Sequence, residues 1–224
     1  MSRLLLALTL LAAAPGPGSA PLRVKASPAV APCVAAAALE YERATGRKLA
    51  VETATLFDAA STEGADVVVA ADAELNRIIE SGATHPDLDV DVAMIPWVLA
   101  GASGSVAVSA ASLARTRATV RVMGGVVGRE ASRSLARQGF DPARIERLRD
   151  PVTPLRLEPG EAAIVPLSLA GSGPVTSLDI PSLTVRALGV RASARPDAAR
   201  AFLDFLTGEK GNAAFRSCGR TERR

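Results

Sequence analysis

The chain has few of the residues on which catalysis and metal binding usually depend. Its 224 residues include one histidine and two cysteines, and aromatic side chains make up only 3% of the sequence. Two cysteines cannot supply a cysteine-based metal motif. The single histidine, His85, has no partner nearby in the sequence and precedes Pro86, which predicts a surface loop. We therefore expect no metal site and no bound cofactor.

Long apolar runs are also missing after the first residues. Residues 4–14 form an apolar stretch behind the basic Arg3, but the stretch is too short to span a bilayer. Small residues at 18–20 then provide a site for a signal peptidase. We predict that residues 1–20 are a signal peptide cleaved near Ala20, and that the remaining chain is periplasmic or secreted.

Neither sign of charge dominates the chain. The formal net charge is +3, and acidic and basic residues interleave along the sequence. This pattern is typical of a solvated surface, so we expect no nucleic-acid partner. Hydrophobic residues make up 48% of a chain long enough for one large domain or two small lobes.

The two cysteines, Cys33 and Cys218, lie near opposite ends of the chain. An even number of cysteines in an exported protein permits a disulfide. Such a bridge would require the C-terminal segment to return to the first helix. Two separate thiols, each buried or partly exposed, are the alternative.

Strand and helix patterns alternate along most of the chain. The expected strands are 22–26, 48–53, 65–71, 94–100, 119–123, 162–166 and 183–190. The expected helices are 30–44, 73–81, 129–138, 140–148, 197–206 and 212–217. Repeated strand–helix units predict an α/β protein whose sheets are predominantly parallel and are flanked by helices.

Two glycine- and serine-rich segments, 101–105 and 171–174, interrupt this pattern. They divide the chain into three parts, which predicts a second lobe inserted into the first. We assign residues 21–100 and 179–224 to lobe 1 and residues 101–178 to lobe 2. The chain would then cross between the lobes twice, through two hinge strands.

Catalytic motifs are not evident in the sequence. No Gly-x-Ser-x-Gly lies between a strand and a helix, and neither glycine-rich segment ends as a phosphate-binding loop does. A serine–histidine–aspartate arrangement would have to use His85. We therefore expect a protein that is not an enzyme, with a secreted hydrolase as the disfavoured alternative.

Small or hydroxyl residues recur where expected strands end and helices begin. Ser27 precedes Pro28, which is typical of an N-cap followed by the first helical residue. Thr53 and Thr55 follow the second strand, and Val127 and Gly128 follow a later one. Ligands of parallel sheets bind beyond the carboxyl ends of the strands, and helix starts favour anions. Each motif alone is typical of capping, but together they predict a cleft for an oxyanion or small polar solute.

Five segments of the sequence resemble a known family. These segments are 22–27, ending in Ser27; 40–49, containing Thr45 and Gly46; 65–72, an apolar strand ending in Asp72; 160–166; and 198–211. They resemble the periplasmic solute-binding proteins of ABC transporters with type II topology, and most closely the molybdate-binding branch. The last two segments are shared by many solute-binding proteins and so are the least specific for a ligand.

The resemblance implies a monomeric two-lobed protein that closes on its solute and is recognised by a membrane permease. Transferred residue by residue, it implies ligand contacts from Ser27, Thr53 or Thr55, Val127 with Gly128, and Ser168. The chain departs from the molybdate branch after the second strand, where Ser-Ser-Gly is usual. It departs again at Ser168, in a place where the branch has a tyrosine. A sensor or accessory protein with a degenerate cleft is therefore the alternative function.

Overall fold

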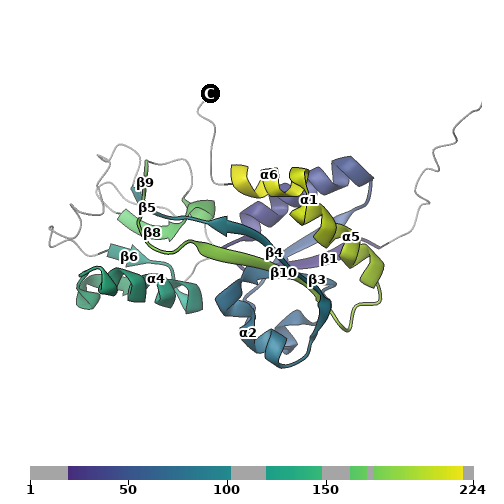
Figure 1. Ribbon diagram of the computed structural model, residues 1–224, viewed down its shortest axis with the longest axis horizontal. Coiled ribbons are helices and arrows are strands. Elements are labelled where there is room, and N and C mark those ends of the chain that lie inside the picture. The colour runs from purple at the N-terminus through teal and green to yellow at the C-terminus, as the bar shows by residue number, and fades with distance from the viewer. Residues whose placement is uncertain (1–19, 102–119, 148–161, 171–173, 219–224) are drawn as a thin grey trace, which may run out of the picture.

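A computed structural model describes residues 20–101, 120–147, 162–170 and 174–218, which form two β-sheets flanked by helices (Figure 1). The predicted signal peptide lies outside these residues, apart from its last residue, Ala20. Most of the two predicted glycine-rich interruptions also lies outside them. No helix in the described ranges is long and apolar enough to cross a membrane.

The first sheet contains five strands in the order β2-β1-β3-β10-β4. The strands are β1 (Leu22–Ala26), β2 (Leu49–Thr53), β3 (Val67–Ala71), β4 (Thr84–Ile95) and β10 (Leu183–Val190). β1 pairs in parallel with β2 and β3, whereas β10 pairs antiparallel with β3 and β4. All five residues of β3 are buried, as its uninterrupted apolar sequence predicts for a central strand.

Helices cover both faces of the first sheet (Figure 1). One face carries α1 (Ala31–Thr45), α5 (Pro196–Thr207) and α6 (Glu209–Ser217), and the other carries α2 (Asp72–Glu80). A short 3-10 helix, η1 (Ala60–Thr62), precedes β3. On the α1 face, the ring of Tyr41 packs edge-on against Phe202 and Phe205, with centroid distances of 5.3 Å to each.

The second sheet also contains five strands, in the order β7-β6-β8-β5-β9. The strands are β5 (Trp97–Gly101), β6 (Val120–Val122), β7 (Ile145–Arg147), β8 (Ala162–Pro166) and β9 (Val175–Ser177). β6 pairs in parallel with β7 and β8, whereas β5 pairs antiparallel with β8 and β9. The associated helices are α4 (Gly125–Arg137), η2 (Pro142–Arg144) and η3 (Leu167–Leu169).

The α/β fold class predicted from the sequence is confirmed, but the sheets are not predominantly parallel. Each sheet has two parallel and two antiparallel pairings. The chain passes from the first sheet to the second at Pro96, between β4 and β5, and returns between β9 and β10. The boundaries assigned to the two lobes stay a prediction.

Two local predictions are wrong. His85 lies in β4 rather than in a loop, because β4 is an edge strand, where Pro86 is tolerated and pairing with β10 extends to Thr84. The predicted helix 140–148 does not form over its described part, residues 140–147. Asp141 caps only the short η2 by accepting the N–H of Ala143, and the chain then joins the second sheet as β7.

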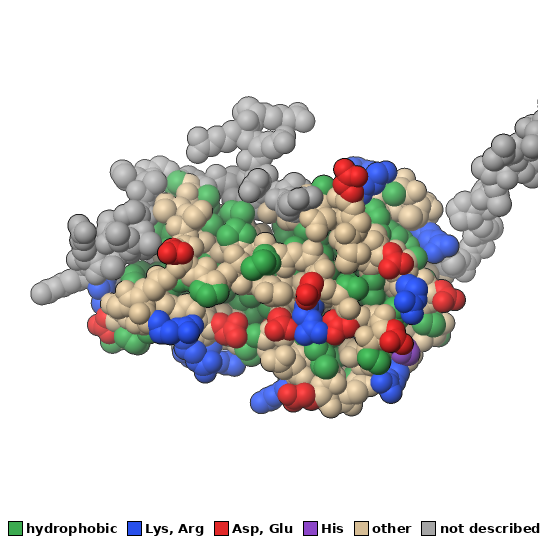
Figure 2. Space-filling model, viewed as in Figure 1, with side chains coloured by type: hydrophobic (Ala, Val, Ile, Leu, Met, Phe, Trp, Pro, Cys, Tyr) green, Lys and Arg blue, Asp and Glu red, His purple; other side chains and the backbone are tan. Residues whose placement is uncertain are grey.

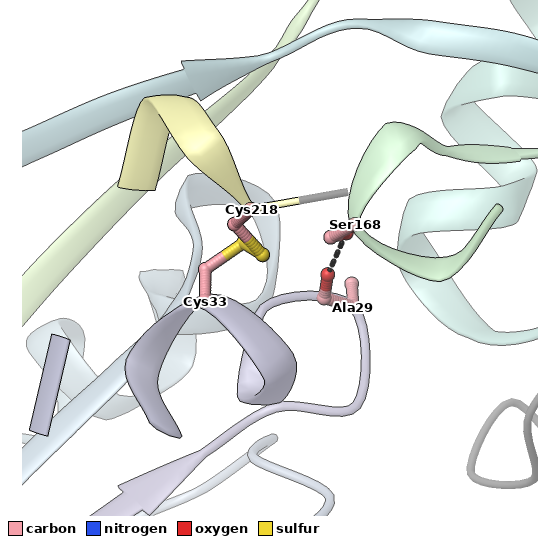
Figure 3. The surroundings of a disulfide bond; sticks show 4 residues. All are labelled: Ala29, Cys33, Ser168 and Cys218. Carbon is pink, nitrogen blue, oxygen red and sulfur yellow. Dashed lines mark hydrogen bonds between the residues drawn. A yellow bond between two sulfur atoms is a disulfide. The ribbon is translucent and has the colours of Figure 1, made fainter. Parts of the chain in front are cut away.

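Cys33 and Cys218 form a disulfide, which settles the alternative left open by the sequence (Figure 3). Cys33 lies near the start of α1 and Cys218 directly follows α6, with 5.1 Å between their Cα atoms. The C-terminal segment therefore returns to the first helix, and the bridge closes a loop over 185 residues of sequence separation.

Removing this disulfide should destabilise the folded protein. Replacing both Cys33 and Cys218 with serine should lower the free energy of unfolding by about 2–4 kcal/mol, because the unfolded chain regains the entropy that the bridge removes. Guanidinium unfolding measures the loss. Reductant should lower the unfolding midpoint of the wild type and leave that of the double variant in place. Equal midpoints for the wild type and the double variant in the absence of reductant would contradict the prediction.

Candidate functional site

The carboxyl ends of three strands meet at one edge of the first sheet. β1 and β2 end side by side, with Ala26 in register with Thr53, and the N–H of Ala54 donates to the Ala26 carbonyl at 2.9 Å. The N–H of Ser27 donates to the carbonyl of Val69 in β3, also at 2.9 Å. The main chain therefore fixes Ser27 between the ends of β2 and β3.

Ser27 does not cap α1, contrary to the prediction. The helix begins at Ala31 and its N-cap position is Val30, which contributes no side-chain hydrogen bond. The carbonyl of Ser27 accepts the N–H groups of Val30 and Ala31, at 3.0 and 2.9 Å, so its main chain rather than its hydroxyl serves the helix start. The side chain is 0% exposed, and its Oγ has no hydrogen-bond partner. A buried hydroxyl without a partner is costly, which makes this atom a candidate ligand group.

Glu74 lies at the same edge, although the sequence reasoning did not select it. Its carboxylate Oε2 accepts the N–H of Ala71, at the end of β3, at 3.2 Å. Alanine has no side-chain acceptor to reciprocate, so this is half of a capping box. The Ala71-x-x-Glu74 spacing is a weak sequence signal, because a capping box starts with serine or threonine rather than alanine.

The environment of Glu74 disfavours its charged form. Burial raises the pKa of Glu74, and the nearby Ser27 hydroxyl and the Ala71 N–H offset part of this effect. Ser27 Oγ is close enough to influence the carboxyl group, yet no hydrogen bond of ordinary geometry joins the two. The Glu74 carboxyl group and the unpartnered Ser27 hydroxyl therefore lie at the same strand ends.

The second sheet contributes the start of α4. The helix begins at Gly125, earlier than predicted, so Val127 and Gly128 lie in its first turn. Val127 is buried, and a Cβ added to Gly128 would lie 1.6 Å from the carbonyl oxygen of Met123. Gly128 is thus needed for the close packing of α4 against the end of β6, which is a structural role.

Ser168 links the second sheet to the segment just before α1 through a hydrogen bond. It lies in η3, directly after β8, and its hydroxyl donates to the carbonyl of Ala29 at 2.5 Å (Figure 3). Ala29 follows Ser27 by two residues, so this buried bond joins the predicted site residues of the two sheets. Because a serine hydroxyl has one proton to donate, Ser168 can only accept from a solute in this arrangement.

Thr53 and Thr55 are both exposed. Thr53 ends β2 beside Ala26, whereas Thr55 precedes Leu56, which is buried and anchors the loop. Of the predicted residues, the structure therefore brings Ser27 and Ser168 to one place, with Thr53 at the adjoining strand end. Arg129, considered as a charged contact, is exposed on α4.

A separate groove of about 750 Å³ lies between α2 and α4. Its lining includes Asn76, Trp97, Glu130 and Arg133, and none of the six predicted ligand residues. Among the described residues, no group of three or more histidine, cysteine, aspartate or glutamate side chains could hold a metal ion. On the face shown in Figure 2, acidic and basic side chains are interspersed.

Comparison with known families decides the class of protein. Residues 22–221 match the family described as bacterial extracellular solute-binding protein. The chain belongs to this family. Its members are binding proteins, in agreement with the expectation that the chain is not an enzyme. A search of curated protein sequences found no match.

This solute-binding protein shares its fold with solved structures of low sequence identity. The periplasmic molybdate-binding protein of Azotobacter vinelandii is 14% identical, with a TM-score of 0.75 over 88% of this chain and 97% of that one. The sulfate-binding protein SubI of Mycobacterium tuberculosis is 15% identical, with a TM-score of 0.67 over 90% of this chain and 86% of that one. The resemblance to the solute-binding family is confirmed, and the fold is two-lobed.

The raised pKa of Glu74 predicts how stability depends on pH. The folded protein holds this proton more tightly than the unfolded chain, so stability should fall as pH rises from the ordinary glutamate pKa of 4.5 through the folded value. Glu74→Gln keeps an acceptor for the Ala71 N–H and removes this loss. Relative to wild type, the variant should therefore gain stability across that window.

Chemical denaturation between pH 4 and pH 8 measures this difference. Glu80→Gln, at an exposed position of the same helix, is the matched control and should keep the wild-type profile. A Glu74→Gln variant whose stability stays parallel to that of wild type at every pH would show that burial does not perturb Glu74.

Proposed function

We propose that this protein captures a small oxyanion or similar small polar solute between its two lobes and delivers it to the membrane permease of an ABC transporter. The main support for this proposal is the Ser27 hydroxyl, which is fully buried at the carboxyl edge of the first sheet and has no hydrogen-bond partner. A solute with an acceptor oxygen would supply the missing bond.

The contact between the two sheets supports this placement of the site. Ser168 reaches the loop of Ser27 through the Ala29 carbonyl, and this loop leads into α1. Solutes of open α/β sheets bind outside the carboxyl ends of the strands, which is where these residues lie. Movement of one lobe relative to the other would open and close the site around the solute.

The solved relatives support the chemical class of the solute. Their titles name molybdate for the Azotobacter protein and sulfate for the Mycobacterium protein, and both solutes are tetrahedral oxyanions. Hydroxyl and N–H donors are the groups by which Ser27 and the start of α4 would hold such an anion. We propose that the protein acts as a monomer in the periplasm.

A thermal-shift titration tests the proposed function. The panel contains molybdate, tungstate, sulfate, phosphate and small organic solutes. A solute present at a hundredfold excess over its dissociation constant should add about 2.7 kcal/mol of stability. A saturable shift with one of these solutes is the expected result. No shift with any of them would favour a degenerate or accessory protein on the same fold.

Ser27→Ala should weaken binding of the solute found in this way by about 1–3 kcal/mol, the usual loss for a hydrogen bond to a charged group. Isothermal titration calorimetry measures the change. Ser177→Ala, at an exposed position of β9, is the control and should bind as wild type does. Unchanged affinity in Ser27→Ala would remove this hydroxyl from the site.

A further inference from the structure

We propose that the groove between α2 and α4 is a second binding site, which takes a small organic dicarboxylate and, when occupied, favours the closed arrangement of the two lobes. The site itself goes beyond the proposed function, because it does not involve the oxyanion. Only its effect on the affinity for the oxyanion rests on that function. Three features support the site: walls from both sheets, separation from Ser27, and two arginines on one wall.

The groove has one wall on each side of the passage between the two sheets. α2 starts directly after β3 of the first sheet, whereas α4 packs against β6 of the second, and the two helices approach each other below β10 in the view of Figure 1. The floor is formed by Trp97, where the chain enters the second sheet, and by residues 181–184, where it returns to the first. A volume of about 750 Å³ is typical of a site for a small organic molecule.

This groove is separate from the proposed oxyanion site. Neither Ser27 nor Ser168 lines it, and the first turn of α4 does not line it either. On α4 the lining begins at Glu130 and continues to the end of the helix at Arg137. An oxyanion beside Ser27 and a ligand in the groove can therefore be bound at the same time.

Arg133 and Arg137 give the α4 wall two guanidinium groups without acidic partners. The two residues are four positions apart, so they lie on the same face of the helix. Among the described residues neither forms an ion pair, and Arg137 donates only to the hydroxyl of Ser134, at 3.1 Å. Glu130 lines the same wall but pairs with neither arginine. Both guanidinium groups therefore keep donors for a ligand.

The opposite wall does not supply the missing carboxylates. Asp72 is the acidic residue of α2 that lines the groove, and it bonds to Arg186 at 2.6 Å. The other polar groups on this side are neutral: the amide of Asn76 and the hydroxyls of Ser182 and Thr184. An anionic ligand therefore meets two cations on one side, and on the other it meets neutral donors and an aspartate that is already paired.

The guanidinium group determines the chemistry of the ligand. Its planar set of donors matches a carboxylate and can bind both carboxylate oxygens. Two such groups one helical turn apart, with about 5–6 Å between their Cβ atoms, match a molecule with two carboxylates joined by a short carbon chain. Trp97, Ala131 and Leu183 line the groove and offer apolar surface to that chain.

Occupancy of the groove should favour closure of the lobes. A ligand that touches both α2 and α4 binds best when the two helices are close, as they are here, where Ser168 of the second sheet bonds to Ala29 before α1. Separation of the lobes would break these contacts, so the ligand shifts the population toward the closed form. By linkage, the dicarboxylate and the oxyanion then raise each other's affinity by the same factor.

Isothermal titration calorimetry with succinate, glutarate and adipate tests the second site, and butyrate serves as the matched monocarboxylate. At least one of the three dicarboxylates should bind saturably, about tenfold or more tightly than butyrate, because two guanidinium groups engage it. Arg133→Gln/Arg137→Gln should weaken this binding by about tenfold or more. The control Arg77→Gln/Arg200→Gln removes two exposed positive charges outside the groove and should bind as wild type does.

Two results of this titration would overturn the site. One is that none of the three dicarboxylates binds the wild type, and the other is that replacing the two arginines leaves their binding unchanged. Competition between the dicarboxylate and the oxyanion would overturn it as well, because both would then occupy one site. Circular dichroism of each variant confirms that loss of binding is not loss of folding.

A second titration measures the effect on closure and separates it from the proposed function. The oxyanion found by thermal shift should bind about fivefold or more tightly to the wild type when the dicarboxylate is saturating, and this gain should vanish in Arg133→Gln/Arg137→Gln. An unchanged oxyanion affinity would overturn the effect on closure while the site stands. If no oxyanion binds the wild type, the proposed function fails, and the dicarboxylate titration alone decides the site.

Discussion

The pairing of β10 between β3 and β4 is the interaction on which the first sheet depends. β10 hydrogen-bonds to both neighbours and is buried along most of its length. It also carries Arg186, which bonds to Asp72 at the start of α2 at 2.6 Å. The strand that completes the sheet therefore also fixes the helix on which Glu74 lies. Because β10 follows the second sheet in sequence, the first sheet is complete only when the chain has returned from the second.

Ser27 and Glu74 illustrate how a binding site differs from a well-paired core. Most polar groups at this edge are satisfied within the protein: the Ser27 main chain bonds to Val69, Val30 and Ala31, and Ser168 bonds to Ala29. The Ser27 hydroxyl lacks a partner, and burial raises the pKa of the Glu74 carboxyl group. Such local costs persist where the surrounding structure enforces them, and they concentrate at functional sites. A solute with an acceptor oxygen would supply the bond that the Ser27 hydroxyl lacks.

Local sequence patterns were sufficient to predict strands that are apolar throughout and helices with one apolar face. β3 is uniformly apolar and fully buried, and α5 has a clear apolar face, so both were predicted closely. Pairing between distant segments was not predictable in the same way. His85 lies in a strand because β4 pairs with β10, about a hundred residues later, and residues 145–147 form β7 because β6 offers an edge. The disulfide could not be decided either, since it depends on where the C-terminal segment returns.

Only part of the site was predicted, because local signals reveal some of its residues and pairing between distant segments brings in the others. Ser27 was selected because a serine before a proline at a strand end is a local signal, although its expected capping role is wrong. Glu74 was missed because only the pairing of β1 with β3 brings Ser27 to the strand end from which α2 starts. The disulfide has one more consequence. A protease that cuts a single peptide bond between Cys33 and Cys218 would leave two fragments that remain covalently joined, so one nick outside the cell would not release either piece.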